Sequence, residues 1–102
     1  MRISETTDLI KIWAMERGLD VADPNKQMLK LIEEVGELAQ GMAKGNRAQI
    51  IDSIGDIHVV LTNISTQLDL DIEDCAEKAY VEIANRKGKM VNGVFVKEAD
   101  LK

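Results

Sequence analysis

The pattern of apolar and polar positions predicts helices along most of the chain. Apolar residues recur every three or four positions over residues 4–17, 24–44 and 46–68, and again from residue 71 onward. That spacing places the apolar side chains of each stretch on one face of a helix. We therefore expect four helices joined by short connections.

Residues that begin and end helices lie at the edges of these stretches. Pro24 suits the first position of the second helix, and Gly18 and Gly45 suit the positions just after a helix ends. Short polar side chains that can accept hydrogen bonds from free backbone N–H groups stand at each expected start. The expected N-caps are Ser4, Asp23, Asn46 and Asp71.

The C-terminal part has a different pattern. Asn92-Gly93 stands between two short runs of apolar β-forming residues. This dipeptide adopts the positive φ angles of a tight two-residue turn, so it predicts a β-hairpin. We expect the hairpin to pack on the helices.

The spacing also predicts which helix faces form the core. The expected stripe of the second helix is Met28, Leu31, Ile32, Val35, Leu38, Ala39 and Met42. The expected stripe of the third helix is Ile50, Ile54, Ile57, Leu61, Ile64 and Leu68. The third helix carries further apolar residues, Ile51, Val59 and Val60, away from that stripe. A helix that is apolar on more than one face is usually buried on more than one face, so we expect a second copy of the chain to cover it.

Composition narrows the class of protein. The chain has 102 residues, which predicts a single domain over residues 1–102. Only 3% of residues are aromatic, so aliphatic side chains must fill the core. Together with the spacing, this predicts an all-α, four-helix-bundle-like domain that assembles into an oligomer and ends in a short β-hairpin.

Charge and the absence of certain segments exclude some functions. The net charge is -5, whereas general binding of nucleic acid needs a basic face. No apolar run approaches the roughly 20 residues of a membrane span. No secretory signal opens the chain, and the one cysteine, Cys75, allows no internal disulfide. We expect a cytoplasmic protein with no nucleic-acid or membrane partner.

Acidic residues cluster in the two central helices. Glu33, Glu34 and Glu37 fall within an arc of about 100° on the second helix, largely opposite its apolar stripe. Asp52 and Asp56 stand four residues apart on the third. The simplest interpretation is a solvated face, with Lys30 pairing to the glutamates.

Three features favour a functional site instead. Gly36 and Gly55 adjoin the acids inside helices, where glycine often marks close approach of a backbone or ligand. Beyond its first turn, the third helix has no lysine or arginine to offset the repulsion between its two aspartates. The short connection at Gly45 can set the two acidic groups at similar height on antiparallel helices.

Clustered carboxylates suit a hard cation such as Mg²⁺, which prefers oxygen ligands and often shares its coordination shell with phosphates. Zinc does not fit, because His58 and Cys75 are the sole soft ligands and belong to no motif. We expect His58 to pack or to hydrogen-bond, and Cys75 to be a small core residue. Trp13 is expected in the core, with stacking on a base as the alternative.

These residues resemble a known family. Gln27-x-x-Lys30-Leu31 leads into Glu33-Glu34-x-x-Glu37, and Asp52-x-x-Gly55-Asp56 follows. The arrangement resembles the MazG-type nucleoside triphosphate pyrophosphohydrolases, whose pattern is E-E-x-x-E followed by E-x-x-D. One position departs from it, because Ser53 stands where the family has glutamate. Asp52, one residue earlier, is the candidate replacement.

The resemblance implies Mg²⁺-dependent hydrolysis of (deoxy)nucleoside triphosphates to monophosphate and pyrophosphate, with Mn²⁺ as an alternative ion. It implies Glu34, Glu37 and Asp56 as metal ligands, with Asp52 as a further candidate. Glu33 would bind metal or orient the attacking water, so Glu33 and Glu34 are the catalytic candidates. It also implies a homodimer or a dimer of dimers.

The remaining contacts to a nucleotide are open. The candidates for contacts with substrate are Lys30, Lys78, Asn85, Arg86, Lys89 and Trp13. Two alternatives stay beside the enzyme hypothesis. In the first alternative, the chain is a non-catalytic helical oligomer with a structural or solvent-facing acidic cluster. In the second, it is a pyrophosphatase for another class of nucleotide.

Overall fold

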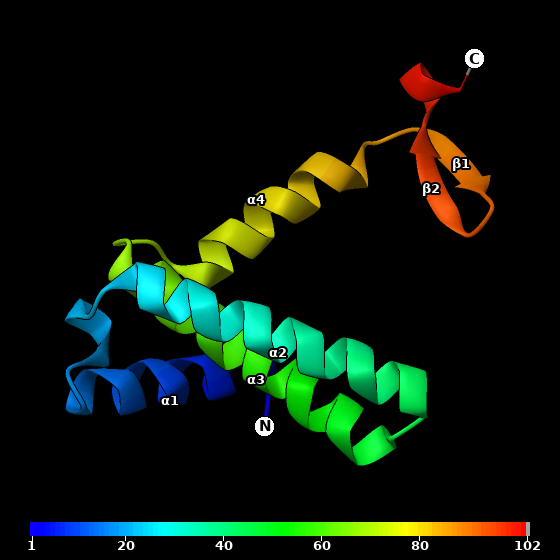
Figure 1. The fold of residues 1–102 in the computed structure, drawn as a ribbon. Coiled ribbons are helices and arrows are strands. Elements are labelled where there is room, and N and C mark those ends of the chain that lie inside the picture. The colour runs from blue at the N-terminus through cyan, green and yellow to red at the C-terminus, as the bar shows by residue number, and fades with distance from the viewer. Residues whose placement is uncertain (102) are drawn as a thin grey trace. The chain divides into compact units, whose positions relative to one another are not determined.

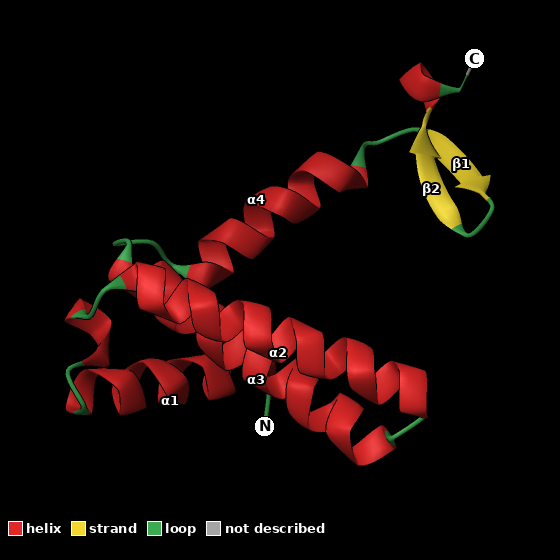
Figure 2. Ribbon diagram, in the orientation of Figure 1, coloured by secondary structure: helices red, strands yellow, loops and turns green. Residues whose placement is uncertain are grey.

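The computed structural model describes residues 1–101 and is mostly helical, with one two-stranded sheet near the C-terminus (Figures 1 and 2). In chain order the elements are α1 (Ile3–Glu16), the 3₁₀ turn η1 (Leu19–Val21), α2 (Pro24–Lys44), α3 (Arg47–Gln67), α4 (Ile72–Ala84), β1 (Gly88–Val91), β2 (Val94–Lys97) and the 3₁₀ turn η2 (Glu98–Asp100). The all-α class with a C-terminal hairpin is confirmed. No helix within residues 1–101 has the length and apolar character needed to span a membrane.

The chain divides into two compact units, Met1–Ile72 and Glu73–Lys102. The first contains α1, α2 and α3, and the second contains α4 after its first residue together with the hairpin. The four-helix bundle, the single domain over residues 1–102 and the oligomer stay predictions.

The predicted signals at the ends of α2 and α3 are confirmed. Asp23 Oδ1 accepts a hydrogen bond from the backbone N–H of Asn25 at 2.9 Å, and Pro24 occupies the first turn. Gly45 ends α2 with a φ of 66°, the left-handed conformation that glycine adopts without strain. Asn46 Oδ1 then accepts from the N–H of Gln49 at 3.2 Å and begins α3.

The N-cap predicted for α1 is wrong. Arg2, not Ser4, is the N-cap, and it provides no side-chain hydrogen bond. The backbone N–H of Thr6 donates to the Arg2 carbonyl oxygen, so the helix starts early enough to place Ser4 within its first turn.

α2 and α3 form an antiparallel pair that packs along a narrow seam (Figure 1). On each helix, one row of buried and half-buried residues follows alternating steps of three and four, the spacing of interlocking helix pairs. The seam residues are Gln27, Leu31, Glu34, Leu38 and Gly41 on α2, and Ile50, Ser53, Ile57, Val60 and Ile64 on α3. Gly41 packs tightly against α3, because a Cβ atom there would sit 3.2 Å from Cγ of Gln49.

Much of the predicted core stripe is exposed, so the prediction that the whole stripe is buried is wrong. Leu31, Leu38, Ile50, Ile57 and Ile64 lie in the seam as expected. The other large residues of the stripes lie on one side of it and form a surface that we call the apolar side: Met28, Ile32, Val35, Met42, Ile54, Leu61 and Leu68. Ala39 is exposed as well. The physical reason is that a seam of this kind takes only two positions in seven, so a wider stripe extends beyond it.

α1 packs against α3 on another face of that helix. Ala14 is 1% exposed there, and Thr7 is 2% exposed. The Thr7 hydroxyl donates to the Ile3 carbonyl oxygen at 2.7 Å, and Thr7 Oγ1 lies 2.9 Å from Nε2 of His58. Because a hydroxyl has one hydrogen to donate, Nε2 of His58 must be the donor in the second bond. The expectation that His58 serves packing and hydrogen bonding is confirmed.

The second unit contains the predicted hairpin. β1 and β2 are antiparallel, with Val91 paired to Val94 across the turn. Asn92 and Gly93 have φ angles of 51° and 81°, which the two-residue turn requires. Cys75 on α4 is exposed rather than a core residue. The reason is that α4 buries none of its side chains in this structure.

Candidate functional site

The seam brings the two acidic groups to the same level. Nε2 of Gln49 donates to the Glu37 carbonyl oxygen at 2.9 Å and to Oε1 of Gln40 at 3.0 Å. Gly41 packs against Gln49. Because the helices are antiparallel, a residue a given number of positions before Gly41 on α2 lies opposite the residue the same number of positions after Gln49 on α3. Glu37 therefore lies level with Ser53, and Glu34 lies level with Asp56.

Glu34 occupies a seam position and is only 7% exposed. Its Oε2 atom is buried without a hydrogen-bond partner. Burial raises the pKa of Glu34, the negative charges of Glu37 and Asp56 raise it further, and Lys30 lowers it in part. A hydrogen bond to the Glu37 side chain, which needs one of the two carboxyl groups protonated, is a further cause that raises the pKa of Glu34. The expectation that Glu34 lies opposite the core is therefore wrong.

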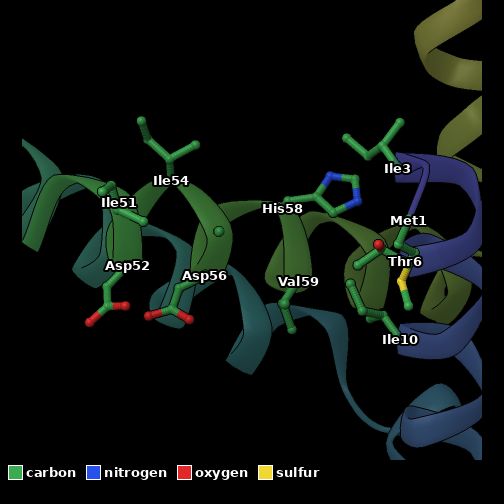
Figure 3. A pocket seen from close by; sticks show the side chains of 11 residues that line it. Met1, Ile3, Thr6, Ile10, Ile51, Asp52, Ile54, Asp56, His58 and Val59 are labelled. Atoms are coloured by element: carbon green, nitrogen blue, oxygen red, sulfur yellow. The ribbon is translucent and has the colours of Figure 1, made fainter. Parts of the chain in front are cut away.

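The other acids are exposed along one side of the seam, opposite the apolar side. We call this set the acidic edge: Glu33, Glu37, Asp52 and Asp56. Figure 3 shows Asp52 and Asp56 projecting from the same edge of α3, whereas Ile54 projects from the other edge. Lys30 is exposed on the same side of α2, one turn before Glu34.

Across residues 1–101, no three side chains of His, Cys, Asp and Glu come together closely enough to hold a metal ion. The full ligand set of Glu34, Glu37, Asp52 and Asp56 therefore stays a prediction. The donor chemistry fits a hard cation, because every candidate is a carboxylate. The unpartnered Oε2 of Glu34 fits as well, because a buried carboxylate oxygen needs a hydrogen bond or a cation.

The family position occupied by Ser53 lies inside the seam. Ser53 is 1% exposed, whereas its neighbour Asp52 is exposed on the acidic edge. The two side chains point in directions about 100° apart on the helix. Asp52 therefore presents its carboxylate from the edge and not from the seam position that Ser53 fills.

The close approach expected at Gly36 and Gly55 is not made by any other part of the chain that the structure describes. A Cβ atom at either position would have no neighbouring atom within 4 Å. No close approach from this chain requires glycine at these two places.

One recess borders the acidic edge, and a second recess adjoins the first. The larger one, about 740 Å³, extends over α3 beside the start of α1 and is drawn in Figure 3. Its lining includes Asp52, Asp56 and His58, and also Thr6, Ile10 and Val59. The second, about 380 Å³, is lined by Thr6, Leu9, Ile10, Trp13 and Val59. Because they share Thr6, Ile10 and Val59, the two recesses adjoin.

Trp13 lines the second recess and is 46% exposed, so its expected place in the core is wrong. The guanidinium of Arg17 lies over its ring, 4.3 Å from the ring centre. Val59, which lines both recesses, was not among the site residues predicted from the sequence. The signal was available, because Val59 follows Asp52 and Asp56 at the helical intervals of seven and three.

Four candidate substrate contacts belong to the second unit. Lys78 lies on α4, and Lys89 lies on β1. Asn85 and Arg86 follow α4, which ends at Ala84. Arg86 pairs with Glu82 at 3.5 Å. Contact between these residues and a substrate stays a prediction.

Comparison with known proteins identifies related sequences. Residues 22–91 match the MazG nucleotide pyrophosphohydrolase domain, and this range includes all five candidate acids. An "Uncharacterized 18.2 kDa protein in rep-hol intergenic region" of Haemophilus phage HP1 (strain HP1c1) is 44% identical over 63 residues. That match covers 61% of this chain but 39% of the phage protein. No solved structure matches.

Proposed function

Because the chain belongs to the MazG nucleotide pyrophosphohydrolase domain family, we propose that it hydrolyses (deoxy)nucleoside triphosphates to monophosphate and pyrophosphate. The observation that carries the proposal is Glu34, whose buried carboxylate oxygen lacks a partner at the level of Asp56. A bound cation would satisfy that oxygen and offset the repulsion among the neighbouring acids.

Glu34, Glu37 and Asp56 would hold Mg²⁺, or Mn²⁺ in its place, with Asp52 as a further ligand from the edge. The ion would neutralise phosphate charge and lower the pKa of a bound water. The water oxygen forms a bond to the α-phosphorus, and the bond from that phosphorus to the oxygen bridging to the β-phosphate breaks. Glu33 is the candidate to orient the water and accept its proton, and pyrophosphate leaves.

The proposed enzyme works as a homodimer or a dimer of dimers. The apolar side supports this, because its seven large residues are each between 39% and 64% exposed within one chain. Contiguous apolar surfaces of this kind mark interaction sites. A second copy of the same α2–α3 pair offers a matching apolar surface.

The test is a turnover panel on the full-length protein. Each common NTP and dNTP is incubated with Mg²⁺ or with EDTA, and the products are separated by chromatography. We expect monophosphate and pyrophosphate with Mg²⁺ alone. Glu37→Gln and Asp56→Asn should each lower kcat/KM by about 100-fold or more, since even residues that only support metal ligands contribute 10–100-fold.

Glu16→Gln is the matched control, because Glu16 is an exposed acid on α1 away from the seam. Full turnover in both site variants would overturn the assignment of ligands. Diphosphate and orthophosphate as products would overturn attack at the α-phosphorus. No product from any nucleotide would favour the non-catalytic oligomer, and product from nucleotide sugars alone would favour the other substrate class.

A further inference from the structure

The recess between α1 and α3 has a lining suited to a flat apolar group. Its residues Thr6, Leu9, Ile10 and Trp13 follow one face of α1 at helical spacing, and Val59 closes it from α3. Two lining residues carry a polar side-chain group: Thr6, whose hydroxyl donates to the Arg2 carbonyl oxygen at 3.3 Å, and Trp13, whose indole N–H is a donor. Stacking and apolar contact are therefore the main interactions that this recess can offer.

The recess continues directly from the acidic edge. Val59 follows Asp56 by three residues, which is about 4.5 Å along a helix axis. Figure 3 shows Asp52, Asp56 and Val59 projecting from the same edge of α3, with Thr6 and Ile10 of α1 beside Val59. A ligand that reaches the carboxylates can extend from one region into the other without crossing a helix.

We propose that this recess holds the nucleobase of the substrate, with the phosphates at the acidic edge. The inference rests on the proposed function, because the carboxylates locate the reacting phosphate. A sugar separates the base from the α-phosphate, and about one helical turn separates Val59 from Asp56, so the two spacings are compatible. Ligand sites in proteins are typically apolar recesses with few polar groups, and a recess of about 380 Å³ falls in their size range.

Trp13 supplies the stacking surface. Aromatic rings bind bases through their π faces, and this contact tolerates different bases. Arg17 lies over the Trp13 ring, and its Nη1 donates to the Trp13 carbonyl oxygen at 3.0 Å. These contacts hold the ring in position beside the recess.

The lining also determines how the base is selected. A site that hydrogen-bonds a base edge discriminates strongly between amino and keto groups, whereas an apolar site discriminates weakly. Because the lining offers two polar side-chain groups, the Thr6 hydroxyl and the Trp13 indole N–H, we expect thymine and cytosine to bind within about tenfold of each other.

The experiment uses the fluorescence of Trp13, the chain's single tryptophan. Thymidine, deoxycytidine and base-free 2-deoxyribose are titrated into the full-length protein without metal. Uncharged nucleosides avoid repulsion by the acidic edge. We expect saturable quenching by both nucleosides and none by the sugar. Absence of quenching by both nucleosides, or equal quenching by the sugar, would overturn the proposal.

Two residues on α1 provide a matched pair of variants. Leu9 and Ile12 are 53% and 51% exposed, and of the two only Leu9 lines the recess. Leu9→Asn should raise the apparent Kd for thymidine at least fivefold, whereas Ile12→Asn should change it less than twofold. Circular dichroism verifies that both variants fold. Equal effects of the two substitutions would count against the recess as the base site.

This outcome is separable from that of the proposed function. Quenching that Leu9→Asn weakens, without hydrolysis of any triphosphate, would retain the base site and reject the enzyme. Hydrolysis with Mg²⁺ without quenching, and with a KM that Leu9→Asn leaves unchanged, would retain the enzyme and reject the base site.

Discussion

At the scale of single residues, Glu34 shows how a small fold can hold an ionisable group in its core. The carboxyl group occupies a seam position that a leucine or isoleucine would fill in an ordinary helix pair. Its raised pKa has burial as the main cause and the charges of Glu37 and Asp56 as the next. At Ser53, a small neutral side chain occupies a buried seam position where the family pattern has a glutamate.

The shift at Glu34 predicts how stability depends on pH. The folded protein binds this proton more tightly than the unfolded chain, so the stabilisation is present below the ordinary pKa of 4.5 and is lost as pH rises through the folded value. Without metal, Glu34→Gln should therefore be more stable than the natural protein at pH 7, by about 1 kcal/mol. Urea unfolding in EDTA at pH 4.5 to 8 measures this difference.

The advantage of Glu34→Gln should shrink as the pH is lowered toward 4.5. Glu33→Gln is the control, because Glu33 is exposed on the neighbouring position. A Glu34→Gln variant that is less stable than the natural protein at pH 7 would show that the charged carboxylate is stabilised in the fold.

At the scale of elements, the α2–α3 pair carries acidic residues on one side and aliphatic residues on the other. The seam uses alternating steps of three and four, so residues on either flank project to opposite sides. Acids of both helices collect on one side, and aliphatic residues of both collect on the other. α1 then adds the wall of the recess beside the acidic edge.

Two glycines of α2 test the packing of this pair. A Cβ at Gly41 would lie 3.2–3.3 Å from Gln49 and Ile50, whereas Gly36 has no neighbour within 4 Å. Gly36→Ala should raise the free energy of unfolding by about 1 kcal/mol, because alanine favours helix. Gly41→Ala should raise it clearly less, because the Gln49 and Ile50 side chains must give way to the added methyl group. Denaturant unfolding of the two variants checks the difference, and an equal gain at both positions would contradict the close contact at Gly41.

At the scale of the whole molecule, no other element of the first unit buries the apolar side. Seven large apolar side chains remain exposed beside the seam. The acidic edge lies on the opposite side of the α2–α3 pair, so association through the apolar side leaves the candidate metal ligands accessible. This arrangement supports self-association without blocking substrate.

The prediction at this scale compares two exposed residues of α2. Ile32 is 60% exposed on the apolar side, and Leu29 is 64% exposed outside it. Ile32→Asp should shift the protein toward monomer by at least tenfold in the dissociation constant, because a charge would be buried against apolar side chains. Leu29→Asp should leave assembly unchanged. Analytical ultracentrifugation distinguishes the outcomes, and a natural protein that is monomeric at high concentration would reject the oligomer.

Local chemistry in the sequence was enough to predict the elements. Caps such as Asp23 and Asn46, the left-handed glycine at Gly45 and the Asn92-Gly93 turn act through bonds to near neighbours, so a short stretch of sequence determines them. The resemblance to the family likewise depends on residue type and spacing alone, and the match over residues 22–91 confirms the family. The roles of the candidate acids stay a prediction.

Only the tertiary structure decided which side of each helix is buried. α2 and α3 carry apolar residues over a wider arc than one neighbour can cover, so the seam depends on how the two helices interlock. That choice buried Glu34 and Ser53 and exposed Ile32 and Ile54. It also brought Trp13 and Val59, 46 positions apart in the sequence, to one recess beside the acids. Such contacts between distant segments are set by packing, and no local pattern contains them.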